Sequence, residues 1–310
     1  MEKKARAFSP AGISSFFEIC DRTADGAPIT DPERIGARGG GFAINKGVLT
    51  HASITETKKK QIRVFINGKL CPEAETTRTV VETLLKKVPE TYNVTVRHRV
   101  DVPIGAGFGS SAAGALGTAL ALNEALNLHL TYNQLGRIAH VAEIKCLTGL
   151  ETVSPLMLGG CVITVEPGAP GYALIDRIPV SPDHRIVAGT YRPFPTKEVL
   201  SSEEKRKPIN EWGRRTLKKI LADPSLENFL RTCKEFAMKT GFTTSRVQKL
   251  IELAEKAGAV GATQNMLGEA VHAVVTIDKV EDVIQAFKKV MPSEKIIVAK
   301  IDLQGPRMLR

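Results

Sequence analysis

The sequence predicts a chain of mixed helices and strands that is divided into two lobes. Its 310 residues are 43% hydrophobic and 25% charged, the composition of a globular protein with an ample core. Residues 92–128 have the pattern of a strand, a glycine-rich loop and a buried helix. A polar, proline-containing stretch at 192–211, which we interpret as a flap or linker, precedes a second group of elements. We therefore expect a boundary near residues 180–195 and place the lobes at 1–185 and 186–310.

Before the glycine-rich loop, the sequence predicts short strands and one helix. Residues 5–20 begin with a strand-like piece and continue into a turn at Ser9-Pro10-Ala11-Gly12, and residues 22–40 have the Asp, Pro, Arg and Gly content of a loop. Asn67-Gly68 is a strong turn signal. The expected strands are 42–44, 48–57 and 61–66, and the expected helix is 76–87.

After the loop, helices dominate and strands return near the end. Thr131 begins an expected helix at 131–147, with Gln134 three residues on, as in a capping box. Asp223-Pro224 predicts a break in the mostly helical stretch 212–239. The remaining expectations are helices at 244–256 and 280–290, strands at 161–165, 186–191, 271–277 and 295–301, and a second glycine-rich loop at 258–268.

The loop at 103–113 (PIGAGFGSSAA) carries the strongest functional signal. Three glycines at alternate positions free the backbone N–H groups to converge on an anion, and the following helix adds its unpaired amides and its dipole. Ser110 and Ser111 can cap this helix, bind a phosphate oxygen or reach a metal ion. The stretch therefore predicts a phosphate-binding site made of Pro103, Gly105, Ala106, Gly107, Phe108, Gly109, Ser110, Ser111 and Ala112.

Three other interpretations of this loop are less consistent with the sequence. A Walker A loop requires lysine after its last glycine, whereas Ser110 follows Gly109. A dinucleotide fingerprint requires an acidic residue after a second strand about 20 residues on, where the helix is still expected to continue. A plain connector that lets a helix pack closely remains open.

The charge and cysteine content exclude several classes of protein. The net charge is +10, but the basic residues are scattered and aromatic residues make up only 5%. We therefore expect no nucleic-acid partner, since little material exists for base stacking, and the basic surface suits anionic metabolites. No apolar run approaches the ~18 residues of a membrane span, so we expect a cytoplasmic protein without a membrane partner. Five widely spaced cysteines argue against a disulfide framework or zinc site.

Three motifs in order resemble those of the GHMP kinases, the family of galactokinase, homoserine kinase and mevalonate kinase. The loop at 103–113 resembles the family's ATP-phosphate motif. Residues 9–13 (SPAGI) resemble its N-terminal, substrate-side motif, and residues 258–268 (GAVGATQNMLG) resemble its C-terminal glycine loop. The resemblance implies a two-lobed α+β fold with an N-terminal lobe like ribosomal protein S5 domain 2 and a ferredoxin-like C-terminal lobe. It also implies ATP and Mg²⁺ as cofactors.

Within that family, the chain most resembles the archaeal pantoate kinases. The matching stretches are 8–17, 36–42, 140–143, 148–150, 159–160, 167–171 and 261–268. This resemblance implies ATP-dependent phosphorylation of pantoate to 4-phosphopantoate in coenzyme A synthesis, and a homodimer is the usual expectation. Other hydroxy acids, such as mevalonate or a phosphomevalonate, and a non-catalytic nucleotide-binding paralogue remain open.

The resemblance assigns roles to particular residues. Glu143 and Ser110 would hold Mg²⁺, and Glu143, Ser110 and Ser111 would form the catalytic group. The matching motifs place Ser14, Arg38, His140, Gly261 and Gln264 at the substrate. A structural alternative remains open for three of these residues. Glu143 would then be a surface glutamate, His140 a packed histidine and Arg38 a solvated loop arginine.

Two positions depart from the pantoate kinase pattern. Thr152 stands where the family normally carries an aspartate, its presumed catalytic base, and Thr164 stands where it tends to carry an arginine for the pantoate carboxylate. Glu151 lies one residue out of register with the missing base. A kinase without a base is still possible, since positioning and metal carry most of the rate in phosphoryl transfer.

Overall fold

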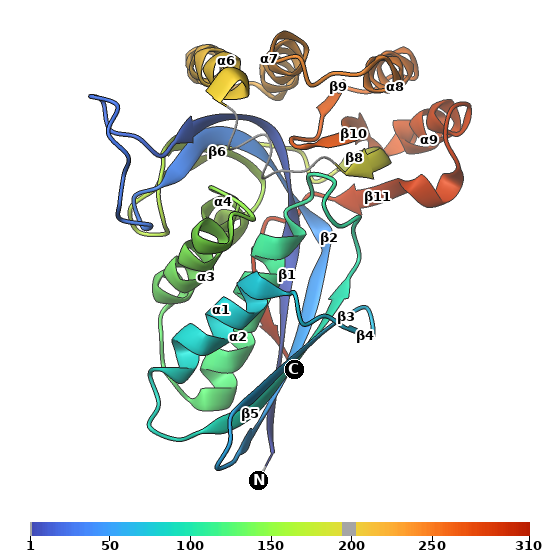
Figure 1. The fold of residues 1–310 in the computed structure, drawn as a ribbon. Coiled ribbons are helices and arrows are strands. Elements are labelled where there is room, and N and C mark those ends of the chain that lie inside the picture. The colour runs from blue at the N-terminus through green and yellow to red at the C-terminus, as the bar shows by residue number, and fades with distance from the viewer. Residues whose placement is uncertain (1, 194–202) are drawn as a thin grey trace.

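The computed structural model describes residues 2–193 and 203–310 and shows two β-sheets with helices packed on them (Figure 1). The larger sheet has the order β12-β1-β2-β5-β3-β4, with β6 paired to β2 and β7 paired to β6. Only the β3–β5 pair is parallel. The strands of the larger sheet are β1 (Lys3–Cys20), β2 (Gly36–Glu56), β3 (Gln61–Ile66), β4 (Lys69–Leu70), β5 (Tyr92–Val100), β6 (Cys161–Glu166), β7 (Leu174–Ile178) and β12 (Arg307–Leu309).

Helices cover one face of this sheet (Figure 1). They are α1 (Glu75–Leu85), α2 (Ser110–Leu126), α3 (Tyr132–Cys146) and α4 (Val153–Leu158). The small apolar residues of α2 are buried nearly all round, so this helix lies at the centre of the layer and packs against β1 and β2. The loop before α2 is thereby held at a fixed place above the sheet.

The second sheet has the order β11-β8-β10-β9, with every pair antiparallel. Its strands are β8 (His184–Pro193), β9 (Gly261–Gln264), β10 (Gly268–Thr276) and β11 (Ile296–Lys300). The helices are α6 (Glu203–Ala222), α7 (Leu226–Lys239), α8 (Ser245–Lys256) and α9 (Val280–Lys288), with 3₁₀ turns η1 (Ile277–Lys279) and η2 (Ser293–Lys295). Helices between β8 and β9 and α9 between β10 and β11 give the expected ferredoxin-like order.

An aromatic cluster joins the two parts of the chain. Phe16 of β1 makes edge-on contacts with Phe229 and Phe236 of α7, with ring centroids 6.2 Å apart in each pair. Phe42 of β2 also packs on Phe229, at 5.5 Å. The strands that carry the motif at 9–13 and the matching stretch at 36–42 are therefore anchored to α7.

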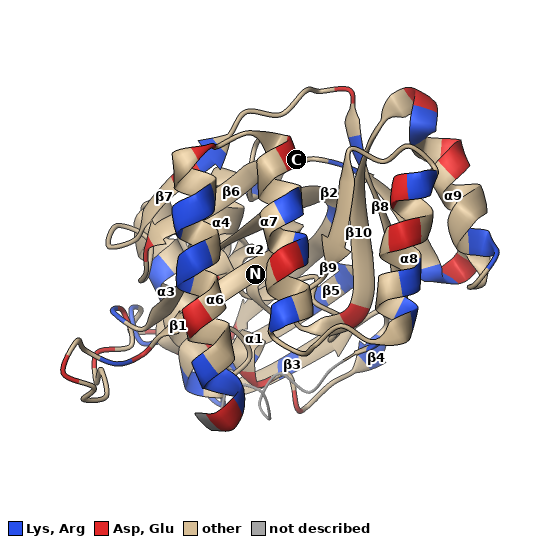
Figure 2. Cartoon of the chain, turned by 90° about the horizontal axis from the view of Figure 1, so that it is seen from above, with Lys and Arg blue, Asp and Glu red and all other residues tan. Residues whose placement is uncertain are grey.

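Figure 2 shows charged residues of both signs along α6, α7 and α8. Ion pairs connect these helices, from Lys219 to Glu235 at 2.7 Å and from Lys234 to Glu255 at 2.6 Å. None of the helices in the described residues is both long and apolar enough to cross a membrane. All five cysteines are free.

The largest error of the sequence-based prediction concerns β1 and β2. The turn expected at residues 9–12 is wrong, because β1 continues through it with a register shift between Pro10 and Ala11. The loop expected to extend to residue 40 ends earlier, since β2 begins at Gly36 and runs for 21 residues. Part of the expected glycine loop at 258–268 is strand β9.

Several local predictions are confirmed. Asn67 and Gly68 form a turn with positive φ, Thr131 and Gln134 form a capping box, and the helix break falls between Ala222 and Leu226. The sequence did not indicate β7, α4 or β12. Of the expected flap or linker at 192–211, residues 194–202 lie outside the described residues, whereas α6 already begins at Glu203.

The lobe boundary between residues 185 and 186 stays a prediction. The second sheet begins with β8 at His184, but β12 returns to the first sheet and pairs with β1.

Candidate active site

A cleft lies where β1, β2, the glycine loop and α4 meet. Its empty volume is about 1110 Å³, which includes the open solvent at its mouth. Its walls come from parts of β1, β2 and β6, from most of the glycine loop at 105–111, from residues 148–152 and 155–156, and from the loop at 266–267. All three sequence motifs therefore contribute to a single cleft.

The phosphate loop, residues 103–111, has the backbone conformation that its glycines predict. Gly105, Gly107 and Gly109 have φ values of +76°, +78° and +57°, a region that favours glycine. Gly109 is also the N-cap of α2, so neither serine caps the helix. Among the described residues, no hydrogen bond is donated by the backbone N–H groups of 105–111. The loop therefore presents a row of unpaired donors at a helix start.

The C-terminal loop, residues 265–268, lies directly on the phosphate loop. A Cβ atom on Gly107 would come within 3.0 Å of Asn265 Cβ, and one on Gly268 within 2.6 Å of the Ala106 carbonyl oxygen. The Met266 N–H donates to the Ser14 carbonyl oxygen at 2.8 Å. Met266 also lines the cleft.

Glu143 lies just behind the wall of the cleft, on α3, and is 3% exposed. Ser111 Oγ donates to its Oε2 at 3.2 Å and Thr148 Oγ1 to its Oε1 at 2.6 Å. Burial raises the pKa of Glu143 to about 7, although both hydroxyl groups act to lower it. Within residues 2–193 and 203–310, no ion pair to Glu143 is formed.

This environment fits a magnesium ion bound together with phosphates. Mg²⁺ usually takes one or two protein oxygens and completes its shell with phosphate oxygens and water. A buried carboxylate with hydroxyl neighbours and no cation of its own supplies such a ligand. Ser110, the other expected ligand, lines the cleft.

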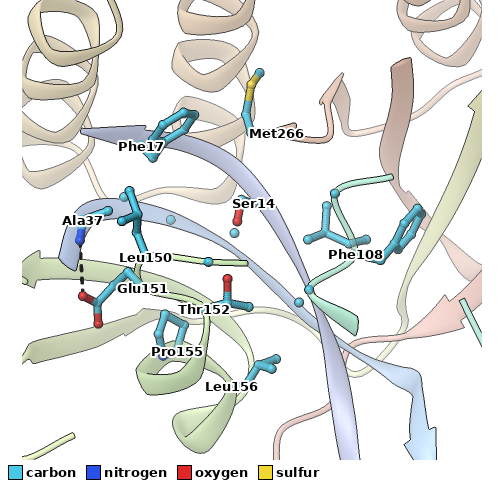
Figure 3. Close-up of a pocket in the computed structure, with 18 of the residues that line it drawn as sticks. Ser14, Phe17, Ala37, Phe108, Leu150, Glu151, Thr152, Pro155, Leu156 and Met266 are labelled. Carbon is cyan, nitrogen blue, oxygen red and sulfur yellow. Dashed lines mark hydrogen bonds between the residues drawn. The ribbon is translucent and has the colours of Figure 1, made fainter. Parts of the chain in front are cut away.

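The far side of the cleft has hydroxyl groups where the family pattern has charges. Ser14 and Thr152 face each other across it, with the Thr152 hydroxyl toward Ser14 (Figure 3). Thr164 lines the cleft from β6 and is 1% exposed.

Glu151 turns away from this point toward Ala37 (Figure 3). Its Oε2 accepts from the N–H groups of Gly168 at 2.9 Å and Ala37 at 3.3 Å. Burial raises the pKa of Glu151 to about 8, so the carboxyl is mainly protonated at neutral pH. This geometry fixes the chain around the cleft rather than presenting a base to it.

Arg38 lines the cleft from β2, with its side chain 34% exposed. Its Nε donates to the Val165 carbonyl oxygen at 3.1 Å. The guanidinium lies 3.5 Å from Glu18 and 3.6 Å from Glu166. Arg38 is the one lysine or arginine among the cleft-lining residues that the structure describes.

The remaining expected site residues lie behind the walls of the cleft. His140 Nε2 hydrogen-bonds to the Ile35 carbonyl oxygen at 2.9 Å, which is the packed alternative. Gln264 is fully buried and donates to the carbonyl oxygens of Phe242 and Gly268. Gly261 packs against Leu230. Pro103, Ala106 and Ala112 shape the phosphate loop without lining the cleft.

Thr148 is a site residue that the sequence-based assignment passed over. It lines the cleft, donates to Glu143 and is linked to Thr76 of α1 at 2.9 Å. The neighbouring Gly149 has no side chain because a Cβ atom would come within 2.3 Å of Glu143 Oε2. The matching stretch at 148–150 was the available signal.

Comparison with known proteins gives the same family as the motifs. The family model described as "GHMP kinases N terminal domain" matches residues 75–160. The pantoate kinase of Thermococcus kodakarensis is 32% identical over 98% of both chains, and that of Methanocaldococcus jannaschii is 31% identical over 91% of this chain and 96% of its own. A solved structure described as a phosphotransferase related to the CoA biosynthesis pathway has a TM-score of 0.88 at 30% identity, covering 99% of each chain. The resemblance and the two-sheet α+β fold are thus confirmed, and the chain belongs to the GHMP kinase family.

Proposed function

We propose that this GHMP kinase transfers the terminal phosphoryl group of ATP to pantoate, as a step of archaeal coenzyme A synthesis. Members of the family are typically ATP-dependent phosphotransferases with alcohol acceptors. Relatives named pantoate kinase match nearly the whole chain. The single observation that carries the kinase assignment is Glu143, a buried carboxylate directly behind the phosphate loop that has no ion pair within the described ranges 2–193 and 203–310.

On the donor side, the unpaired N–H groups of residues 105–111 would bind the phosphates of ATP. Glu143 and Ser110 would hold Mg²⁺, which supplies charge neutralisation on the phosphate oxygens when bound. Thr148 and Ser111 orient the carboxylate of Glu143 by donating one hydrogen bond to each of its oxygens.

On the acceptor side, the cleft suits an aliphatic hydroxy acid with one negative charge. The walls are largely apolar, with Phe16, Phe17, Leu150 and Leu156 among them. Arg38 would bind the substrate carboxylate, and the carboxylates of Glu18 and Glu166 already balance much of its charge. A phosphorylated acceptor would bring at least two charges to a single, shared arginine.

We propose that the transfer proceeds without a carboxylate base. Thr152 occupies the expected position of the base, and the Glu151 carboxyl is engaged by two backbone N–H groups. The rate would then come from alignment of the acceptor hydroxyl with the phosphate and from charge neutralisation.

Thr152 and Thr164 support a second candidate, a kinase for another hydroxy acid such as mevalonate. The expected homodimer also stays a prediction.

The decisive experiment is ADP release from ATP and Mg²⁺ with a panel of pantoate, mevalonate, phosphomevalonate and homoserine. We expect turnover with pantoate and none with phosphomevalonate, and loss of turnover in Glu143→Gln. ATP binding without turnover on any acceptor would instead indicate the non-catalytic nucleotide-binding paralogue.

A further inference from the structure

A buried chain of three polar side chains connects β1 to the C-terminal loop. Ser15 Oγ lies 3.0 Å from His272 Nε2, and His272 Nδ1 lies 2.8 Å from Asn265 Oδ1. All three residues are fully buried. Neither His272 nor Asn265 lines the cleft, so these two side chains do not contact a substrate bound there.

The direction of these hydrogen bonds follows from the chemistry of the groups. Burial lowers the pKa of His272 to about 3, so the ring is neutral and has one donor and one acceptor nitrogen. Asn265 Oδ1 can only accept, so Nδ1 carries the proton and Ser15 donates to Nε2. The ring is also fixed by Phe42, with centroids 5.6 Å apart. Each member therefore orients the next.

The end of this chain lies against the phosphate loop. Asn265 Cβ is at 3.0 Å from the position that a Cβ on Gly107 would occupy, and the Asn265 N–H donates to Ala270 at 2.9 Å. The side-chain nitrogen of Asn265 is buried with no partner among the described residues. Such an orphaned donor is costly, so a bond to the other end of the amide, its oxygen, must hold the side chain in this orientation. The bond from His272 does so.

We propose that Ser15, His272 and Asn265 form a positioning chain that holds the phosphate loop, through Gly107, in its nucleotide-binding shape. The same chain ties that shape to β1, where the neighbouring Ser14 lines the acceptor side and accepts from Met266. His272 and Asn265 are positioning residues, since they act through the loop rather than on the nucleotide. This inference rests on the proposed nucleotide role of the loop.

The test uses three substitutions of His272 and calorimetric binding of Mg·ADP, which needs no turnover. His272→Phe keeps the packing on Phe42 but breaks both hydrogen bonds, and we expect about tenfold weaker Mg·ADP binding, the usual effect of one buried hydrogen bond. The amide of His272→Asn can reproduce the Nδ1 donor and should restore most of the affinity. His272→Gln reproduces only the Nε2 side and should bind as weakly as His272→Phe.

The matched control is Asn228→Ala. Asn228 is a buried asparagine of α7 that bonds to carbonyl oxygens of Lys219 and Asp223, away from the cleft. It should lose thermal stability with unchanged Mg·ADP affinity. If His272→Phe does not fold, the test is the difference in Mg·ADP affinity between the Asn and Gln variants. Tighter binding by His272→Asn, together with a loss of affinity in Ser15→Ala, would support the positioning chain.

Equal Mg·ADP affinity in the Asn and Gln variants, or in wild type and all His272 variants, would overturn the positioning chain while leaving the kinase proposal intact. Failure of the wild-type protein to bind Mg·ADP would overturn both.

Discussion

Replacing Glu143 by glutamine should stabilise the ligand-free protein at alkaline pH while it abolishes catalysis. Burial moves the pKa of Glu143 from 4.5 to about 7. Since a tenfold change in an equilibrium constant corresponds to ~1.4 kcal/mol, ionising this carboxyl in the folded protein costs about 3 kcal/mol more than in the unfolded chain. The folded pKa is raised, so the contribution of Glu143 to stability is complete below pH 4.5. It is lost as the pH rises through 7.

Glutamine has the same shape and no such loss, and the Ser111 and Thr148 hydroxyls can rotate to suit the amide. The variant should therefore gain about 3 kcal/mol relative to wild type between pH 5 and pH 8. For 310 residues the unfolding entropy is about 0.65 kcal/mol/K, which converts this gain into about 4–5 °C in Tm. Other titrating groups, Glu151 among them, contribute equally to both proteins and cancel.

The assay is scanning calorimetry of both proteins at several pH values, with and without Mg·ADP. Without ligand, the difference in Tm should grow with pH, and with Mg·ADP the wild-type protein should gain stability that the variant lacks. A difference in Tm that is constant from pH 5 to pH 8 would refute the reasoning, because Glu143 would then not be a buried carboxyl without a counter-charge.

Three further substitutions test the two sides of the cleft. Glu151→Gln should leave kcat within a few-fold of wild type, whereas loss of a general base would lower it about 10²- to 10⁴-fold in steady-state assays. Arg38→Gln should raise KM for the acceptor about 10- to 100-fold and leave KM for ATP unchanged, and an equal effect on both would contradict its role. Gly109→Ala and its control Gly26→Ala both place alanine at positive φ. The new Cβ atom would come within 2.6 Å of Thr152 Cγ2 at position 109, whereas at position 26 it would meet no atom within 4 Å. Both variants should lose stability in thermal unfolding, while only Gly109→Ala should lose Mg·ADP binding. An equal effect of the two substitutions on Mg·ADP affinity would show that the loop does not bind the nucleotide.

The phosphate loop could be predicted because its signal is local. Alternate glycines between a strand and an apolar helix leave few conformations, and Gly105, Gly107 and Gly109 adopt the expected positive φ. Glu143 could be proposed only from family resemblance. Its burial depends on Ser111 and Thr148, which approach it only in the folded chain.

The errors have a common physical origin in long-range pairing. Pro10 and Gly12 indicate a turn locally, but β2 lies alongside them and accommodates them in a bulge. The expectation that His140 and Gln264 lie at the substrate came from motif position and stays a prediction. Their side chains hydrogen-bond to the backbone carbonyl oxygens of Ile35 and of Phe242 and Gly268, respectively. The local pattern around these two residues does not show which distant partners their side chains meet.

The pairing of β12 with β1 has a consequence for the order of folding. Arg6 lies opposite Leu309, and Arg307 stacks on Phe8 at 4.6 Å, so residues 6–8 of β1 are paired by a strand from the far end of the sequence. Contacts with such sequence separation form late, because a long loop must close first. Until residues 307–309 have been synthesised, β1 presents an open edge to other chains. A fragment of residues 1–185 would keep that edge open permanently, and we expect it to aggregate where the whole chain does not.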